Sequence, residues 1–283
     1  MNFKRIMWFP ASTIVALGLM FGSVVAPVAS ATTSHAKRTT TFVGGDIHTL
    51  TYTSTGLFVT GHLSGSLSKD EGTTWKTVPS FKNADIMSWA TTSVGYLAGG
   101  HYGLFRSTNG GKTFTRFSFF GKVSDVHSLG AAGKNVYMGS PQVGFLRSTN
   151  GGKTWKVINQ KFGQGFMGSM LVDATNPLKV IAPDMNNGLV LTTDGGKVWS
   201  RFGGPSSVMS VDWNRKNPKE IVALSMGKGA LTKDFGKTWS TFYVPMGASA
   251  IAFSPTGTKL FVAILGSEKA EILSSANGGK SWI

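Results

Sequence analysis

Histidine and methionine recur at matching positions of a repeated pattern, and they are the side chains in this chain best suited to chemistry. The sequence has 5 histidines, 11 methionines and no cysteine, so thioether is its only soft ligand. One series lies near the starts of successive short apolar runs: His48, Met87, His127, Gly168, Met209 and Ser249. A second series lies six residues before each repeat motif described below: His62, His101, Gln142, Asn186, Met226 and Lys269.

Two interpretations of these series are open. In the first, His48, His62, Met87, His101 and His127 share one solvent-reachable mouth and bind a metal ion, and Met209 and Met226 belong to the same ligand-binding surface. Copper fits this set best, Cu(I) in particular, because imidazole and thioether are its favoured ligands. In the second, the methionines fill irregular core gaps and the histidines satisfy buried strand ends.

Three aspartates, Asp46, Asp85 and Asp125, stand two residues before the first three members of the first series. Two carboxylates flanking a glycosidic bond are the minimum for glycoside hydrolysis, one acting as the acid and the other as base or nucleophile. These aspartates are therefore the catalytic candidates if the protein is an enzyme. The alternative, which we favour, is that each aspartate caps a tight turn. No phosphate-binding loop, Ser or Cys triad or zinc signature is present.

Six segments share a long motif, here called the repeat motif. It has a hydroxyl residue, then Asp or Asn two positions later, Gly after four and Trp or Phe after seven. The Asp or Asn positions lie 39 to 44 residues apart and are Asp70, Asn109, Asn150, Asp194, Asp234 and Asn277. The pattern predicts a turn in which this side chain accepts hydrogen bonds from the following backbone amides and the glycine supplies an unusual backbone angle. We therefore interpret the six residues as structural.

The elements that must position these side chains are short strands. Alternating apolar runs bounded by Gly, Ser, Asn or Pro predict roughly four strands per repeat, which is one blade of a β-propeller. Six repeats predict an all-β, six-bladed propeller over residues 39–283 as a single domain. The sequence stops one residue after the last motif aromatic, Trp282, so the extended run Thr39–Val43 is expected to supply the missing outer strand and close the ring.

The repeat motifs resemble the Asp-boxes of the sialidase and sortilin class of propellers, from about residue 40 to the end of the chain. The segments Asp46-Ile47-His48, Asp85-Ile86-Met87, Gly99-Gly100-His101 and Asp125-Val126-His127 resemble secreted bacterial BNR-repeat proteins that carry a glycosyl hydrolase label. The photosystem II assembly factor is a more distant likeness. The resemblance implies that the motifs lie between third and fourth strands, on the face opposite the ligand. A sialidase mechanism is disfavoured, because Arg106 and Arg147 precede motifs and the other arginines form no cluster.

Residues 1–31 are typical of a secretory signal, with Lys4 and Arg5 before an apolar stretch and Ala29-Ser30-Ala31 as a cleavage site. We expect a short leader at residues 32–38 and a secreted or envelope-associated protein; a retained anchor is the alternative. The net charge of +15 favours adhesion to anionic envelope polymers or lipid headgroups. Nucleic-acid recognition is not expected, because the lysines are scattered. A monomer is expected.

These observations favour a non-enzymatic extracellular binding propeller whose His-, Met- and Asp-lined mouth holds copper or a protein segment. A glycoside hydrolase acting on a polysaccharide is the first alternative. An assembly or sorting scaffold, similar to the photosystem II assembly factor or sortilin, is the second. The ligand on these three interpretations is a metal ion or protein segment, a glycan, and a protein partner, respectively.

Overall fold

Short apolar runs punctuated by glycine and turn residues fold into antiparallel strands throughout this protein. The structure, a computed structural model, describes residues 38–117 and 124–283, which belong to one compact unit. Within those ranges the only helical element is a 3-10 turn, Pro79–Phe81, and no helix is long and apolar enough to cross a membrane. The predicted signal and all but the last residue of the predicted leader lie outside the described residues.

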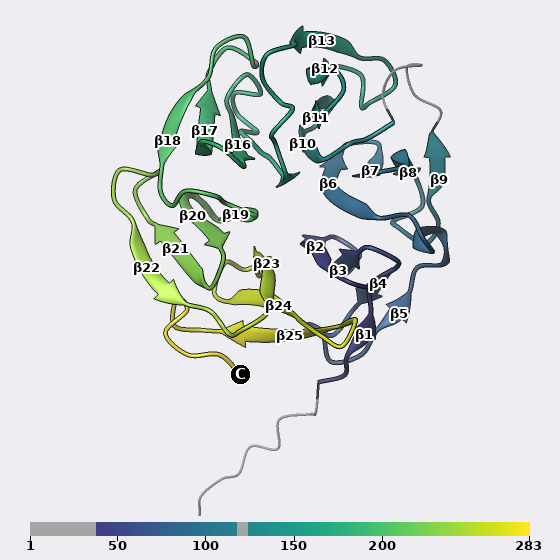
Figure 1. Cartoon of the computed structure of the whole chain (residues 1–283), viewed down its shortest axis with the longest axis vertical. Helices are drawn as coiled ribbons and strands as arrows, with labels where there is room; N and C mark the ends of the chain where they lie inside the picture. Colours follow the sequence, from purple (N-terminus) through teal and green to yellow (C-terminus); the bar gives the residue numbers. More distant parts are fainter. Residues whose placement is uncertain (1–37, 118–123) are drawn as a thin grey trace, which may run out of the picture. The chain divides into compact units, whose positions relative to one another are not determined.

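Six sheets follow one another around a ring in chain order, so the predicted six-bladed propeller is confirmed (Figure 1). Blades one and two are β2 (Ile47–Thr53), β3 (Gly56–Gly61), β4 (Gly65–Ser68), β5 (Lys76–Thr77), and β6 (Ile86–Thr92), β7 (Gly95–Gly100), β8 (Gly103–Ser107), β9 (Thr115–Phe117). Blades three and four are β10 (Ser128–Ala132), β11 (Asn135–Ser140), β12 (Gly144–Ser148), β13 (Lys156–Asn159), and β15 (Leu171–Val172), β16 (Val180–Asp184), β17 (Gly188–Thr192), β18 (Ser200–Gly203). Blades five and six are β19 (Ser210–Asn214), β20 (Asn217–Ser225), β21 (Lys228–Thr232), β22 (Ser240–Tyr243), and β23 (Ala248–Phe253), β24 (Leu260–Gly266), β25 (Lys269–Ser275), β1 (Thr41–Phe42).

The ring is closed by the N-terminal strand, as the sequence predicts. Strand β1 pairs antiparallel with β25, with Thr41 opposite Ala270 and Phe42 opposite Lys269. Val43 extends the contact: its amide donates to the carbonyl of Glu268, and its own carbonyl accepts from the amide of Leu63 in blade one. Val43 therefore joins the last blade to the first.

The fourth blade departs from the others at its inner edge. A two-residue strand, β14 (Gly168–Ser169), pairs in parallel with β10 of the preceding blade, with Gly168 opposite Ser128. The amide of Met170 then donates to the carbonyl of Leu129 at 2.7 Å. The chain thus borders blade three before it enters blade four at β15, and this is why the first strand of the fourth blade is short.

The hydrophobic core lies between neighbouring blades. Six clusters of buried apolar side chains each combine strands from two adjacent blades, because a sheet with two apolar faces must pack on a neighbour at each side. Every motif aromatic packs against one of these clusters: Trp75, Phe114, Trp155, Trp199, Trp239 and Trp282. The repeat motif therefore ties each outer turn to the interface between blades.

The repeat motif forms a hydrogen-bonded turn between the third and fourth strands of a blade. In blade one, Asp70 Oδ1 accepts from the amide of Thr74 at 2.8 Å, and the Ser68 hydroxyl oxygen accepts from the amide of Gly72 at 2.8 Å. The hydroxyl contact was not foreseen from the sequence. In blade five, hydrogen bonds from Thr238 lower the pKa of Asp234 to about 2, so this carboxylate is an acceptor rather than a general acid at neutral pH.

Candidate functional site

One end of the central channel, here called the mouth, collects the starts of the innermost strands and the loops that follow the second strands. In blade one, His48 lies at the start of β2 and His62 lies just after β3, and the antiparallel pairing of β2 with β3 brings both to the same side. The repeat motif follows the third strand, which runs away from this end. The motifs therefore lie on the face opposite the mouth, as expected.

Asp85 lies at the centre of a group of histidines at the mouth. Its side chain is only 6% exposed, and three imidazoles surround it. Asp85 Oδ1 lies 3.0 Å from His48 Nε2, and Asp85 Oδ2 lies 3.2 Å from His62 Nδ1 and 3.4 Å from His101 Nδ1. Two of these imidazoles come from blade one and one from blade two, so a single carboxylate connects the blades at the mouth.

Two glycines allow the backbone to reach this arrangement. A Cβ atom on Gly100 would collide with the Asp85 carbonyl oxygen, and one on Gly61 would collide with the Asp46 carbonyl oxygen. Asp85 itself has φ +47°, a left-handed conformation that Asp and Asn tolerate better than most residues. The dipeptides Gly61-His62 and Gly100-His101 are therefore the local signal that places a histidine beside an aspartate at the mouth.

His127 stands apart from the carboxylate and stacks on a second imidazole. The rings of His101 and His127 lie 5.0 Å apart at 19°, and His127 Nε2 is buried with no hydrogen-bond partner among the described residues. Burial, together with the neighbouring His101, lowers the pKa of His127 despite the opposing charges of Asp125 and Asp85. His127 therefore stays neutral down to a lower pH than a solvated histidine does.

Replacing His127 with Gln is expected to make the free energy of unfolding depend less strongly on pH below neutrality. The folded state binds the His127 proton only at a lower pH than the unfolded state does, so this contribution to stability is fully present above the unfolded pKa of about 6.5 and is lost as the pH falls from there through the lowered folded pKa. Melting temperatures measured between about pH 7 and pH 5 should fall less steeply in His127→Gln than in wild type. Equal slopes would contradict this assignment.

The three candidate carboxylates lie in three different environments. Asp85 is occupied by imidazoles, as described above. Asp125 Oδ2 accepts from Gln142 Nε2 at 2.6 Å, which ties two loops of blade three together. Asp46 is half exposed, with Oδ1 3.2 Å from His48 Nε2. Their equal spacing in the sequence does not give them equal surroundings: Asp85 meets histidines of the neighbouring blade, whereas Asp46 and Asp125 each meet a residue of their own blade.

Methionines line a separate cavity of about 430 Å³ at the mouth, here called the methionine cavity. Its walls come from five blades and include Asp46, Ile47, His48, Met87, Met167, Gly168, Met185, Ser207, Val208, Met209, Met226 and Ser249. Five of the six first-series residues are among them, and His127 is the exception. Met87 therefore lies with the other methionines rather than among the imidazoles around Asp85, and only His48 belongs to both groups.

Among the described residues, the His and Asp side chains that could hold one metal ion are Asp46, His48 and His62. One donor atom from each lies within 4.8 Å of the other two. His101 and His127, which the spacing places with them, stack on each other outside this group. The set is two nitrogens and one oxygen, so its chemistry is borderline rather than soft.

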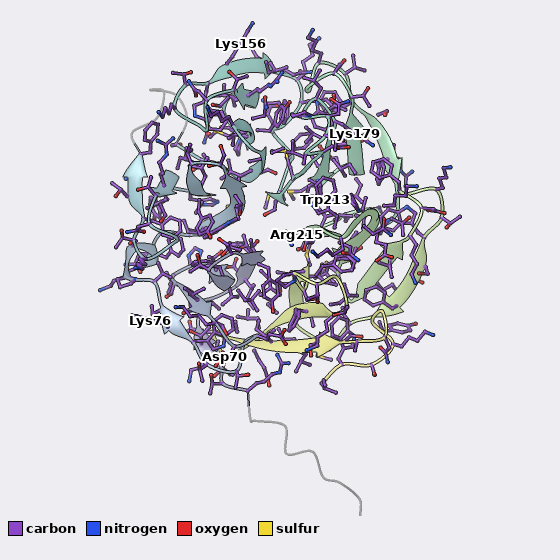
Figure 2. The ribbon with its side chains drawn as sticks, turned by 180° about the vertical axis from the view of Figure 1, so that it is seen from behind. Asp70, Lys76, Lys156, Lys179, Trp213 and Arg215 are labelled. Atoms are coloured by element: carbon purple, nitrogen blue, oxygen red, sulfur yellow. The ribbon has the colours of Figure 1, made fainter. Side chains whose placement is uncertain are left out.

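A second, polar cavity of about 220 Å³ lies deeper in the channel and was not foreseen from the sequence. It contains Asp212, whose carboxylate accepts from the amide of Phe253 at 2.9 Å and lies 3.7 Å from the Arg215 guanidinium. Burial raises the pKa of Asp212, and Arg215 opposes this effect. Figure 2 shows Trp213 and Arg215 beside the centre of the ring and Asp70 at its periphery. The periodicity of β19 gave no sign of a buried carboxylate there.

No family model matches the chain, and no curated protein matches it. Solved structures do. A GH74 enzyme from Niastella koreensis superposes with a TM-score of 0.61 at 14% identity over 87% of this chain and 55% of that one. A YCF48 structure bound to a D1 peptide gives 0.52 at 18% identity over 70% of this chain and 65% of that one. YCF48 from Cyanidioschyzon merolae gives 0.51 at 17% identity over 88% and 86%.

The chain spans just over half of the GH74 structure and just under two thirds of the peptide-bound YCF48 structure. At these identities the likeness concerns the fold alone. By its own strand order and by these neighbours, the chain is a β-propeller of the kind found in GH74 enzymes and YCF48.

Proposed function

We propose that this propeller is a non-enzymatic, extracellular binding protein whose methionine cavity holds an apolar polypeptide segment. The observation that carries the proposal is the gathering of five methionines around one open cavity, with Met226 85% and Met185 58% exposed. Large exposed apolar side chains that rim one concavity are typical of a binding surface. Methionine suits such a surface because its flexible thioether adapts to irregular partners.

The polar side chains at the rim of the methionine cavity favour a ligand that binds in one orientation rather than through apolar contacts alone. Asp46 and His48 border the methionine cavity, and Ser207 and Ser249 add hydroxyls on its other sides. A few convergent polar groups around an apolar floor are the usual composition of a specific ligand site. The YCF48 propeller, which has a similar fold, is bound to a D1 peptide in its solved structure, and this supports a peptide ligand for the present propeller.

Binding is favoured over glycoside hydrolysis by the state of the carboxylates. Hydrolysis requires a general acid and a second carboxylate, both facing the substrate. Asp85 is buried among imidazoles and Asp125 is held by Gln142, which leaves Asp46 as the exposed member of the three candidates. Asp46 alone does not make a pair, although the GH74 neighbours share the fold.

The predicted signal and the basic charge complete the proposal: the whole sequence carries +15, and +13 remains when Lys4 and Arg5 are removed with the signal. A secreted basic propeller would be concentrated at anionic envelope surfaces by long-range electrostatics. Its mouth would then meet segments of envelope proteins. On this proposal the charge sets the location and the methionine cavity sets the ligand.

The test is selection of short random peptides by display against the purified protein, followed by fluorescence anisotropy with the enriched peptides. The selected sequences should be rich in apolar residues. Met185→Glu combined with Met226→Glu should weaken binding at least about tenfold, because two carboxylates would have to lose water against an apolar ligand. Both side chains are exposed, so folding should be unaffected.

The matched control is Met246→Glu. Met246 is 94% exposed but does not line the cavity, so this variant should bind the selected peptides as wild type does. Equal weakening by Met246→Glu would indicate a general charge effect. Selection of no peptide by the wild type, or unchanged binding by the double variant, would remove the proposal.

A further inference from the structure

The three donor atoms beside the methionine cavity are arranged as metal ligands are. Asp46 Oδ1 and His48 Nε2 are 3.2 Å apart, and a donor of His62 lies within 4.8 Å of both. Two ligands at zinc-like bond lengths in a tetrahedral site are separated by about 3.3 Å. The 3.2 Å separation is that of a direct Asp–His pair, and the same separation lets both side chains bind one ion that takes the place of their contact.

We infer that Asp46, His48 and His62 bind a divalent transition metal ion of the Zn²⁺ or Cu²⁺ type. Two imidazoles and one carboxylate suit such ions, whereas Mg²⁺ and Ca²⁺ prefer all-oxygen sites. Cu(I), which favours thioether ligands, is less suited to a set of two imidazoles and one carboxylate. The inference thus keeps the prediction of a metal site at the mouth. It changes the ligands to Asp46, His48 and His62, and the ion from Cu(I) to a divalent one.

Asp85 gives the site its charge and its rigidity. Without an ion, its Oδ1 lies 3.0 Å from His48 Nε2 and its Oδ2 lies 3.2 Å from His62 Nδ1. An ion at His48 Nε2 would replace the contact of that nitrogen with Asp85, whereas His62 can keep Nδ1 on Asp85 and offer Nε2 to the ion. A carboxylate on the ring nitrogen that the ion does not take fixes the ring and strengthens binding. With Asp46 it supplies two negative charges, which match a divalent cation.

This site is separate from the proposed polypeptide ligand, although the two share a border. Asp46 and His48 line the methionine cavity, whereas His62 does not. A variant of His62 therefore tests the metal without touching the apolar walls. The selected peptides should bind His62→Gln as they bind wild type, which separates failure of one proposal from failure of the other.

The experiment is calorimetric titration of the purified protein with ZnCl₂ and with CuCl₂, accompanied by melting curves with each ion. Wild type should bind one ion and melt at a higher temperature in its presence, because a ligand that binds only the folded state stabilises it. Asp46→Asn and His62→Gln should each weaken binding by about tenfold or more. Co²⁺ added in place of zinc should give the visible absorption of a low-coordinate nitrogen and oxygen site.

His101→Gln is the matched control. His62 and His101 are both about half exposed, and both place Nδ1 beside Asp85 Oδ2, but only His62 belongs to the donor group. His101→Gln should therefore retain binding within about threefold. Absence of binding to wild type at about 100 µM of either ion, or equal losses in His62→Gln and His101→Gln, would overturn the inference.

Discussion

Val43→Asp is expected to unfold this propeller or to lower its free energy of unfolding by at least about 4 kcal/mol. Val43 has no exposed surface and packs in the cluster between the last and first blades. Its amide and carbonyl join Glu268 in blade six to Leu63 in blade one. The substitution would lose apolar burial and place an unpaired carboxylate at the seam of the ring, and a ring opened at one interface exposes the core on both sides.

Phe42→Asp is the matched control for this result. Phe42 is the last residue of β1 and directly precedes Val43, but it is 44% exposed, so its replacement should cost about 1 kcal/mol or less. Guanidinium denaturation followed by tryptophan fluorescence measures both variants. A Val43→Asp protein as stable as Phe42→Asp would mean that the N-terminal strand is not required to hold the ring together.

The fold was predictable because the repeat restricts it at several levels at once. Each motif fixes one turn, each turn fixes the spacing of the strands around it, and six copies fix the blade count. The closing strand followed from what the sixth repeat lacked, and β1 pairs with β25 as expected. The irregular entry to blade four was missed, since the pairing of Gly168 with Ser128 is made across blades and leaves no local sequence pattern.

The site was predictable only as far as the periodicity extends. Strand position alone brings His48 and Met209 to one end of the channel. Whether a side chain then turns towards the cavity or towards the neighbouring blade depends on contacts between blades, which spacing does not encode. Met87 and His127 occupy equivalent positions in the repeat, yet one lines the methionine cavity and the other stacks on His101.

The same reasoning explains why Asp85 was misjudged. Its spacing made it equivalent to Asp46 and Asp125, and turn capping was the favoured role. The Asp85 carboxylate instead contacts imidazoles of two blades. The Gly61-His62 and Gly100-His101 dipeptides are the sequence feature that could have indicated these contacts. The three aspartates now have separate expected roles: Asp46 as a metal ligand, Asp85 as an anchor and Asp125 as a partner of Gln142.

Asp85→Asn is expected to lower the free energy of unfolding by about 2 to 3 kcal/mol, because it removes a buried charge that holds three imidazoles. Asparagine keeps the size of the side chain and tolerates the φ of +47°, so the loss reports the charge and not the backbone. Denaturant unfolding at neutral pH measures it. Histidine NMR signals should also shift for His48, His62 and His101 together.

Asp46→Asn separates this anchoring role from metal binding. The Asp46 side chain is 52% exposed and touches His48 alone among the three imidazoles around Asp85, so its replacement should change stability without metal by no more than about 0.5 kcal/mol. It should nevertheless lose the stabilisation by Zn²⁺. If Asp85→Asn were as stable as Asp46→Asn, the buried carboxylate would not join blades one and two, and the mouth would be held by the backbone alone.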